Sequence, residues 1–131
     1  MNSEILVIAL GGRVVGLDAA TGIELWRNEM ELGGISFVAL AADERHVFAS
    51  ASAGKVFCIQ RQTGETLWAQ NTSGIGRATL LLSKEKLIVS KGGRIDCFTT
   101  AGQALWNHDL RKTGKGVAAL CLGHQVVQAD G

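Results

Sequence analysis

The side chains of this sequence that could carry out chemistry are few, and they stand apart from one another. The candidates for metal binding or catalysis are three cysteines and three histidines: Cys58, Cys97, Cys121, His46, His108 and His124. A metal site needs several such ligands to converge, and a catalytic triad needs a nucleophile, a base and an orienting acid within reach of one another. No spacing here predicts either arrangement. We therefore expect no metal, no cofactor and no catalytic residue, and we read the histidines as exposed or hairpin-edge side chains.

The segment KTGKG, residues 112–116, is a further candidate because it resembles a phosphate-binding loop. It lacks the GxxxxGK[ST] spacing of a P-loop, and it leads into an apolar run typical of a strand, where a phosphate loop needs a helix N-terminus. Its glycines match the register of Gly74 and Gly76 ahead of the previous apolar run. The segment is therefore interpreted as a turn that precedes a strand.

A sequence repeat dominates the chain and must set the position of every side chain in it. The three copies are RVVGLDAATGIELW at 13–26, KVFCIQRQTGETLW at 55–68 and RIDCFTTAGQALW at 94–106. Each copy begins with a basic residue, alternates apolar positions, and carries a glycine four residues before a closing tryptophan. The tryptophans recur about every 40 residues, a period typical of four-stranded propeller blades.

Apolar runs bounded by glycines predict about thirteen short strands and no helix. The expected strands fall at 4–10, 13–18, 23–30, 35–41, 46–50, 55–60, 65–71, 77–82, 86–90, 94–98, 103–109, 117–122 and 124–129. Gly11 and Gly12 supply the positive φ that a two-residue hairpin requires. The chain, 1–131, is read as a single domain of three units, at about 4–41, 46–82 and 86–122, with a terminal strand at 124–129.

The first copy resembles the tryptophan-docking motif of the PQQ-like, or quinoprotein-type, β-propeller repeat, which reads small residue, x, Asp, x, x, Thr, Gly, x, x, x, Trp. The matching positions are Asp18, Thr21, Gly22 and Trp26 in the first copy, Thr63, Gly64 and Trp68 in the second, and Gly102 and Trp106 in the third. The second copy has Gln60 at the acidic position, and the third copy is one residue shorter.

The resemblance implies an all-β fold of β-propeller blades, built as three four-stranded antiparallel repeats. Each tryptophan would dock between neighbouring blades, and the strand after it would become the innermost strand of the next blade. A blade that packs against a neighbour on each face needs inner strands that are apolar on both faces, as RATLLL at 77–82 is. We expect all three tryptophans to be buried and structural.

The same family contains quinoprotein dehydrogenases, which bind pyrroloquinoline quinone and calcium. Those enzymes resemble one another in a much longer chain of eight blades, a secretory signal, an adjacent cysteine pair and a set of calcium-binding carboxylates. Here the cysteines are isolated, and no acidic cluster falls on the predicted inner strands. We therefore predict that the chain is not an enzyme. Arg77 and Lys115, beside the glycines that precede inner strands, could reach the mouth of a central channel, although solvated turn charges are the simpler interpretation.

The charge balance indicates which class of partner to expect, and the cysteines indicate the cellular compartment. Lys and Arg number 13 against 12 for Asp and Glu, so no net field favours nucleic acid or an anionic membrane as a partner. The apolar run at 5–10 is too short for a signal peptide or a membrane span. Cys58 and Cys97 occupy equivalent positions in different units, which favours small buried side chains in a reducing compartment. We expect a cytoplasmic protein with all three thiols reduced and buried.

These observations favour a non-enzymatic scaffold that binds a protein partner. A propeller that binds or senses a small ligand is the alternative, and a fragment of a quinoprotein-type enzyme is the third reading. Propellers close with about four to eight blades, so three repeats leave exposed edges. We predict a homodimer of six blades, in which the innermost strand at 116–122 completes the partner's opening blade at 4–30. Segment 124–129 would then duplicate 4–10, and one of the two should be an extra edge strand or be disordered. The rival prediction is a fragment of a longer propeller.

Overall fold

The computed structural model describes residues 4–30, 37–52 and 54–127, and all the regular structure in these residues is β. The expected all-β fold is confirmed, and the described residues form thirteen strands. Every pair of neighbouring strands is antiparallel. None of these residues forms a helix long and apolar enough to cross a membrane.

Four sheets follow one another along the chain. The first, in the order β1-β2-β3, consists of β1 (Ile5–Leu10), β2 (Arg13–Asp18) and β3 (Glu24–Asn28). The second, in the order β4-β5-β6-β7, consists of β4 (Val38–Ala42), β5 (His46–Ala51), β6 (Lys55–Gln60) and β7 (Thr66–Asn71). The third, in the order β8-β9-β10-β11, consists of β8 (Ala78–Ser83), β9 (Lys86–Lys91), β10 (Arg94–Thr99) and β11 (Ala104–Asp109). The last pairs β12 (Leu120–Leu122) with β13 (Gln125–Val127).

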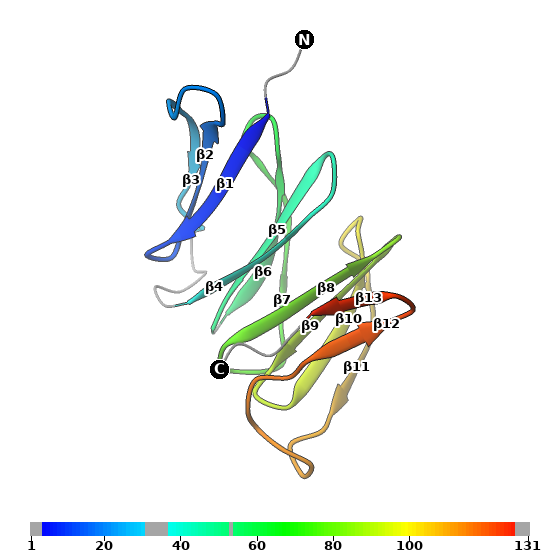
Figure 1. The fold of residues 1–131 in the computed structure, drawn as a ribbon. Coiled ribbons are helices and arrows are strands. Elements are labelled where there is room, and N and C mark those ends of the chain that lie inside the picture. The colour runs from blue at the N-terminus through cyan, green and yellow to red at the C-terminus, as the bar shows by residue number, and fades with distance from the viewer. Residues whose placement is uncertain (1–3, 31–36, 53, 128–131) are drawn as a thin grey trace.

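The strand that follows each of the first two tryptophans begins the next sheet, as the resemblance implied: β4 comes after Trp26, and β8 comes after Trp68. Figure 1 shows the sheets standing one behind another as a fan, with the β1–β3 sheet at one end and β11 toward the other. The first strands β4 and β8 lie in contact with each other on the inner side of the fan. The sheets are therefore blades, and each is offset by one strand from the repeat seen in the sequence.

The core lies between blades because the strands of the middle blade are apolar on both faces. On β5, Val47 and Ala49 pack toward the β1–β3 sheet, while Phe48 between them packs toward the β8–β11 sheet. The residues of β6 alternate in the same way. Successive strand residues point to opposite faces, so a strand with apolar side chains at every position can bury both faces only between two neighbouring sheets.

Several expected strands are shorter than predicted, for local reasons. The strand expected at 23–30 ends at Asn28, because Asn28 Oδ1 accepts the Met30 N–H at 2.8 Å and Met30 takes a positive φ of 51°. In the run expected at 117–122, the Ala118 carbonyl accepts a bond of 2.8 Å from Thr79 Oγ1, and the strand begins only at Leu120. The runs expected at 35–41 and 124–129 extend beyond the described residues, and their described strands are β4 and β13.

Candidate functional site

The first docking contact joins Trp26 on β3 to the turn between β6 and β7. The indole lies flat over Gly64, and its Nε1 donates a hydrogen bond of 2.9 Å to the carbonyl of Arg61. A Cβ added at Gly64 would lie 2.5 Å from the ring atom Cδ2, and the φ of Gly64 is +78°. Only glycine meets both conditions, since other residues rarely take this φ and would collide with the ring. Trp26 is buried, as expected.

The second contact repeats the first one blade further along. Trp68 on β7 covers Gly102, where an added Cβ would lie 2.7 Å from Cδ2 of the ring, and Trp68 Nε1 donates to the Thr100 carbonyl at 3.0 Å. Trp68 is half-buried and also contacts Phe48 and Phe98, with ring centroids 6.0 and 6.3 Å away. The predicted docking role is therefore seen for two of the three tryptophans.

The other motif residues build the turn that receives the ring. In the first turn Asp18 Oδ1 accepts the Ala20 N–H at 2.9 Å, and Thr21 Oγ1 accepts the Ile23 N–H at 3.2 Å. In the second turn the Thr63 hydroxyl donates to Gln60 Oε1 at 2.8 Å, so the amide oxygen at this position keeps an acceptor role. These side-chain bonds hold the glycine in its left-handed conformation, which is the structural role predicted for the motif.

A second donor at each contact was missed by the sequence reasoning. Asn28 Nδ2 donates to the Gly64 carbonyl at 2.9 Å, and Gln70 Nε2 donates to the Gly102 carbonyl at 2.7 Å. Both amides stand two residues after a tryptophan, and His108 holds the same place after Trp106. A polar side chain at this spacing in every copy was the signal that could have revealed the donor.

The third tryptophan corrects a prediction. Trp106 on β11 is 50% exposed, so the expectation that all three tryptophans are buried is wrong. Trp26 and Trp68 each lie over a glycine turn of the blade that follows, whereas none of the described glycines after β11 lies beneath an indole. The first turn shows the reverse case, a glycine turn that no indole covers. A Cβ added at Gly22, whose φ is +76°, would meet nothing within 4 Å.

The three cysteines also differ in burial. Cys58 and Cys97 are fully buried, as expected, and burial raises the pKa of the Cys58 thiol to about 12, with a smaller effect from the nearby Asp43 carboxylate. Cys121 is exposed, so its predicted burial is wrong. Cys121 lies on the short strand β12, and no further sheet among the described residues covers its outer side. All three thiols are unpaired.

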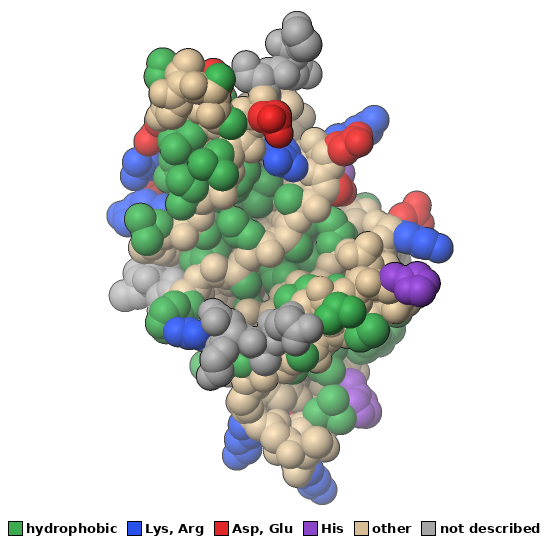
Figure 2. All heavy atoms as spheres, viewed as in Figure 1, with side chains coloured by type: hydrophobic (Ala, Val, Ile, Leu, Met, Phe, Trp, Pro, Cys, Tyr) green, Lys and Arg blue, Asp and Glu red, His purple; other side chains and the backbone are tan. Residues whose placement is uncertain are grey.

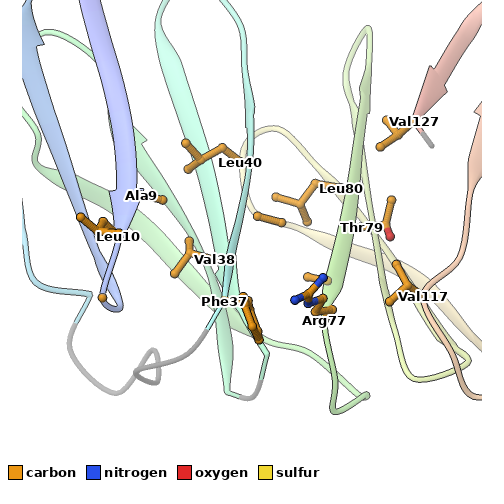
Figure 3. Close-up of a pocket in the computed structure, with 13 residues that line it drawn as sticks. Ala9, Leu10, Phe37, Val38, Leu40, Arg77, Thr79, Leu80, Val117 and Val127 are labelled. Carbon is orange, nitrogen blue, oxygen red and sulfur yellow. The ribbon is translucent and has the colours of Figure 1, made fainter. Parts of the chain in front are cut away.

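A hollow of about 590 Å³ lies on the inner side of the fan, where the first strands of the blades meet. Ala9, Val38, Leu40, Leu80, Val117 and Val127 are among its lining residues, and Figure 3 shows these side chains pointing toward it from β1, β4, β8 and the C-terminal segment. The Arg77 guanidinium lies 3.8 Å from the centre of the Phe37 ring at this hollow. Arg77 is among the lining residues of this hollow, whereas Lys115 is exposed and is not among them. The contact of either residue with a channel mouth stays a prediction.

The remaining candidates do not converge. Among the described residues, no three side chains of His, Cys, Asp or Glu come together. His46 lies beside Asp43, with Nδ1 3.1 Å from Oδ1, and is half-buried at the start of β5, whereas His108 and His124 are exposed. The segment 112–116 contains the end of a turn in which the Gly114 N–H donates to the Leu110 carbonyl at 3.0 Å, in keeping with its interpretation as a turn.

A buried polar cluster connects the second and third blades, and no sequence pattern predicted it. Lys91 is 1% exposed, and its Nζ donates to Thr72 Oγ1 at 2.9 Å. The Asp96 carboxylate accepts bonds from Ser73 N at 3.0 Å and from Ser73 Oγ at 2.9 Å. Burial lowers the pKa of Lys91 to about 8, against the opposing attraction of Asp96. The cluster thus fixes the connection from β7 to β8.

Antiparallel blades arranged as a fan and joined by tryptophan docking define part of a β-propeller. Within that class, the chain belongs to the PQQ-like family described as outer membrane protein assembly factor BamB, whose model matches residues 10–131. No curated protein sequence matches the chain at a significant level.

Solved structures share the fold at low sequence identity. BamB from Moraxella catarrhalis is similar with a TM-score of 0.69 and 22% identity, over 95% of this chain and 39% of that one. Quinohemoprotein alcohol dehydrogenase from Comamonas testosteroni has a TM-score of 0.65 and 19% identity, over 80% of this chain and 19% of that one. A europium-containing methanol dehydrogenase has a TM-score of 0.60 and 18% identity, over 80% of this chain and 22% of that one. The chain thus spans less than half the length of each of these relatives.

Proposed function

We propose that this chain is a non-enzymatic scaffold whose blades bind another protein. The family described as an outer membrane assembly factor supports this class of role, since assembly factors work by contact with other proteins. The proposal includes a reducing, cytoplasmic setting, in keeping with three unpaired cysteines.

The observation that carries the proposal is a row of leucines at the rim of the fan. Leu25, Leu67 and Leu105 each stand directly before a tryptophan, on the outermost strands β3, β7 and β11. They are 49%, 49% and 44% exposed. A single exposed leucine needs no explanation, but the same apolar side chain at the same exposed place in every unit makes a regular contact surface for an apolar partner.

A photo-crosslinking amino acid placed at Leu67 in cells tests the proposal, with the same group at Lys84, in the exposed turn between β8 and β9, as the control. We expect one protein to be crosslinked from position 67 and not from position 84. That protein, once purified, should bind the purified chain saturably. The double substitution Leu67→Ser with Leu105→Ser should abolish binding, and Ile75→Ser, which removes an apolar side chain that is 77% exposed outside the row, should not. Equal binding by all of these variants would refute the role of the row.

A small-ligand site is the alternative function, and the hollow of about 590 Å³ favours it. Its apolar lining and the Arg77 guanidinium at its edge suit an apolar ligand with an anionic group. Titration with a fluorescent fatty acid measures this directly. Binding that is weakened at least tenfold by Arg77→Gln would favour the alternative over the scaffold.

The residues present do not fit the quinone and calcium of the dehydrogenases. The only side chains with polar groups that line the hollow in the described residues are Arg77 and Thr79, so its lining contributes no carboxylate for calcium. None of the three cysteines lines the hollow, and none is paired with another. A titration with pyrroloquinoline quinone, followed by absorbance in the presence of calcium, tests the enzyme reading. We expect no saturable change.

The proposal also includes a homodimer, with the fan of one copy completed by the other to a ring of six blades. A ring removes the exposed edge strands that a partial propeller leaves. The edge of β1 that faces away from β2 has no strand beside it among the described residues.

A further inference from the structure

Each copy of the repeat begins with a basic residue, and the structure places these residues at one end of the blades. Arg13, Lys55 and Arg94 are the first residues of β2, β6 and β10. Because neighbouring strands are antiparallel, these three strands begin at the end of the blades that also carries the connections from β3 to β4, from β7 to β8 and from β11 to β12. This end, with the three basic residues and the described parts of these connections, is called the basic face below. Blades pack through their sides, so the ends of their strands lie at the surface in an open fan and in a closed ring alike.

Cations outnumber carboxylates among the described residues on the basic face. The connections carry four further cations: Arg77, Arg111, Lys112 and Lys115. The turns at the opposite end of the blades carry both signs, as in Asp43, Glu44 and Arg45 between β4 and β5. In Figure 2 the Asp and Glu side chains lie mainly in the upper part of the view, and Lys and Arg side chains project at its lower end. The formal net charge of +1 therefore conceals a separation of charge along the blades.

The cation of the middle blade has no carboxylate to neutralise it. Lys55 is half-buried, its cross-strand neighbour is the neutral Asn71, and no ion pair joins it to another described residue. In the two flanking blades the corresponding cations have acidic partners, in the pairs Arg13–Glu29 and Arg94–Asp109. The basic residue that opens each repeat is therefore not explained by a cross-strand ion pair alone.

Two large apolar side chains are exposed on the same face. Phe37, directly before β4, is 61% exposed, and Ile75, on the connection from β7 to β8, is 77% exposed. The Arg77 guanidinium lies 3.8 Å from the centre of the Phe37 ring, as Figure 3 shows. The Gly76 N–H donates to the Ser52 carbonyl at 2.7 Å, which holds this connection against the end of the middle blade. Exposed apolar side chains bordered by charged ones are typical of an interaction surface.

We propose that the basic face binds an acidic, extended segment of a partner protein. Its carboxylates pair with Lys55 and the cations beside it, and its apolar side chains pack on Phe37 and Ile75. This inference goes beyond the proposed scaffold contact, which lies on the leucine row at the rim of the fan. Either contact can fail without the other.

The spacing of the repeat indicates the form of the segment. Sheets packed face to face lie about 10 Å apart, so one cation follows the next at about this distance from Arg13 to Lys55 to Arg94. In an extended polyproline II segment every third side chain lies on the same side, and three residues advance about 9 Å. An acidic residue at every third position therefore meets one cation in each blade.

A protein segment suits this face better than a nucleic acid or a lipid surface does. Glu29 and Asp109 stand among the cations, and a phosphate backbone or an anionic bilayer would bring continuous negative charge against them. A peptide can place neutral side chains at these positions. It can also supply the apolar contacts that Phe37 and Ile75 require, which a phosphate backbone does not offer.

Fluorescence anisotropy with a labelled peptide of Glu-Leu-Pro repeats tests the proposal, since proline favours the polyproline II form. A peptide of about twelve residues spans the three cations, and we expect saturable binding with a Kd between about 1 and 100 µM. Replacement of every glutamate by glutamine, or of every leucine by serine, should weaken binding at least about tenfold. Salt at about 0.5 M should also weaken binding of the acidic peptide, because it screens charge pairs at a surface.

Charge reversal on the protein provides the second test. Lys55→Glu should weaken peptide binding at least about tenfold, because it turns an attraction into a repulsion. Lys86→Glu is the matched control, with the same change of charge at the first residue of β9, at the opposite end of the blades. It should change the Kd by less than about twofold. Phe37→Ser should weaken binding by about fivefold or more through lost apolar contact.

Absence of peptide binding at about 1 mM overturns the proposal, as does binding that neither Lys55→Glu nor the glutamine peptide weakens. Vesicles containing phosphatidylserine and a labelled single-stranded DNA are measured in parallel. Tighter binding to either of these that depends on Lys55 would assign the face to a membrane or to a nucleic acid and overturn the acidic segment.

One variant separates this inference from the scaffold contact. The double substitution Leu67→Ser with Leu105→Ser should bind the peptide as the parent does, because it leaves the basic face intact. Loss of peptide binding in this variant would place the peptide on the leucine row and overturn the inference. Intact peptide binding together with no crosslinked protein from position 67 would refute the scaffold contact alone.

Discussion

At the scale of the residue, a docking glycine is required for two reasons: its positive φ and the indole that lies over it. Two turns of this chain allow the two effects to be measured separately. Gly22 and Gly64 share a left-handed φ, but only Gly64 lies under an indole. Gly22→Ala in the monomer therefore meets backbone strain alone, which costs about 1–2 kcal/mol. Gly64→Ala meets the same strain and also collides with Trp26, so it should cost about 1–3 kcal/mol more.

Urea unfolding of the two alanine variants, at a concentration too low for pairing, measures this difference. Substitution of Trp26 by alanine in the Gly64→Ala background is the control, because removal of the ring should remove the extra cost of the alanine Cβ. Equal stability of Gly22→Ala and Gly64→Ala would show that the indole exerts no steric demand on its turn.

The cysteines give a second prediction at this scale. A thiol reagent added to the folded chain should modify Cys121 quickly and leave Cys58 and Cys97 untouched, because the first is exposed and the others are fully buried. The raised pKa of Cys58 also keeps it in its unreactive thiol form at neutral pH. Mass spectrometry should find one label per folded chain, none on Cys121→Ser and three after denaturation. Two or more labels on the folded parent would contradict the burial.

At the scale of the element, the connection from β7 to β8 depends on a buried charge. Burial lowers the pKa of Lys91 from its usual 10.5 to about 8, so the unfolded chain binds this proton more tightly than the folded chain between these two values. Stability contributed by this group should therefore rise as the pH rises from about 8 to 10.5. Cys58 acts in the opposite direction above pH 9, because its folded pKa is raised.

Comparison with Lys91→Met isolates the lysine, since the thiols are common to both proteins. We expect the stability of the parent relative to this variant to increase between pH 8 and pH 10.5 in urea titrations, with little change between pH 6 and pH 7.5, where Lys91 is charged in both states. A difference that stays constant over the whole range would mean that Lys91 is not desolvated in the folded chain.

The elements themselves could largely be predicted, because period-2 apolar patterns and glycine turns are local signals. The resemblance of the motif to the PQQ-like repeat also implied which strand begins each blade. Burial could not be predicted in the same way. Trp26 and Trp106 have the same local sequence setting, yet Trp26 is 8% exposed and Trp106 is 50% exposed, because burial depends on the blade that follows.

The Lys91 cluster is a second feature that could not be predicted from the sequence. A lysine at the end of a strand ordinarily extends into solvent, and nothing in the chain near Lys91 indicates that its ammonium group will be buried and donate to Thr72. The contact joins residues from different blades, so it exists only after they pack. The amide donors Asn28 and Gln70 were within reach of prediction, since their spacing from tryptophan repeats.

At the scale of the whole molecule, stability should depend on protein concentration. A pair of copies that forms only from folded chains stabilises the folded state by mass action. We expect the melting temperature of the parent to rise by several degrees between about 1 and 100 µM. A parent melting temperature that does not change with concentration would argue against pairing, whatever particle mass is found.

The docking contacts have a consequence for how such a chain can change in evolution. The indoles of Trp26 and Trp68 each dock on the turn of the unit that follows, so each of these docking contacts is specified by two adjacent segments of the gene. An in-frame duplication of one unit of about 40 residues would carry one ring and one turn with it, and both would find their counterparts. The number of blades per polypeptide can therefore grow by copying, without any new interface having to arise.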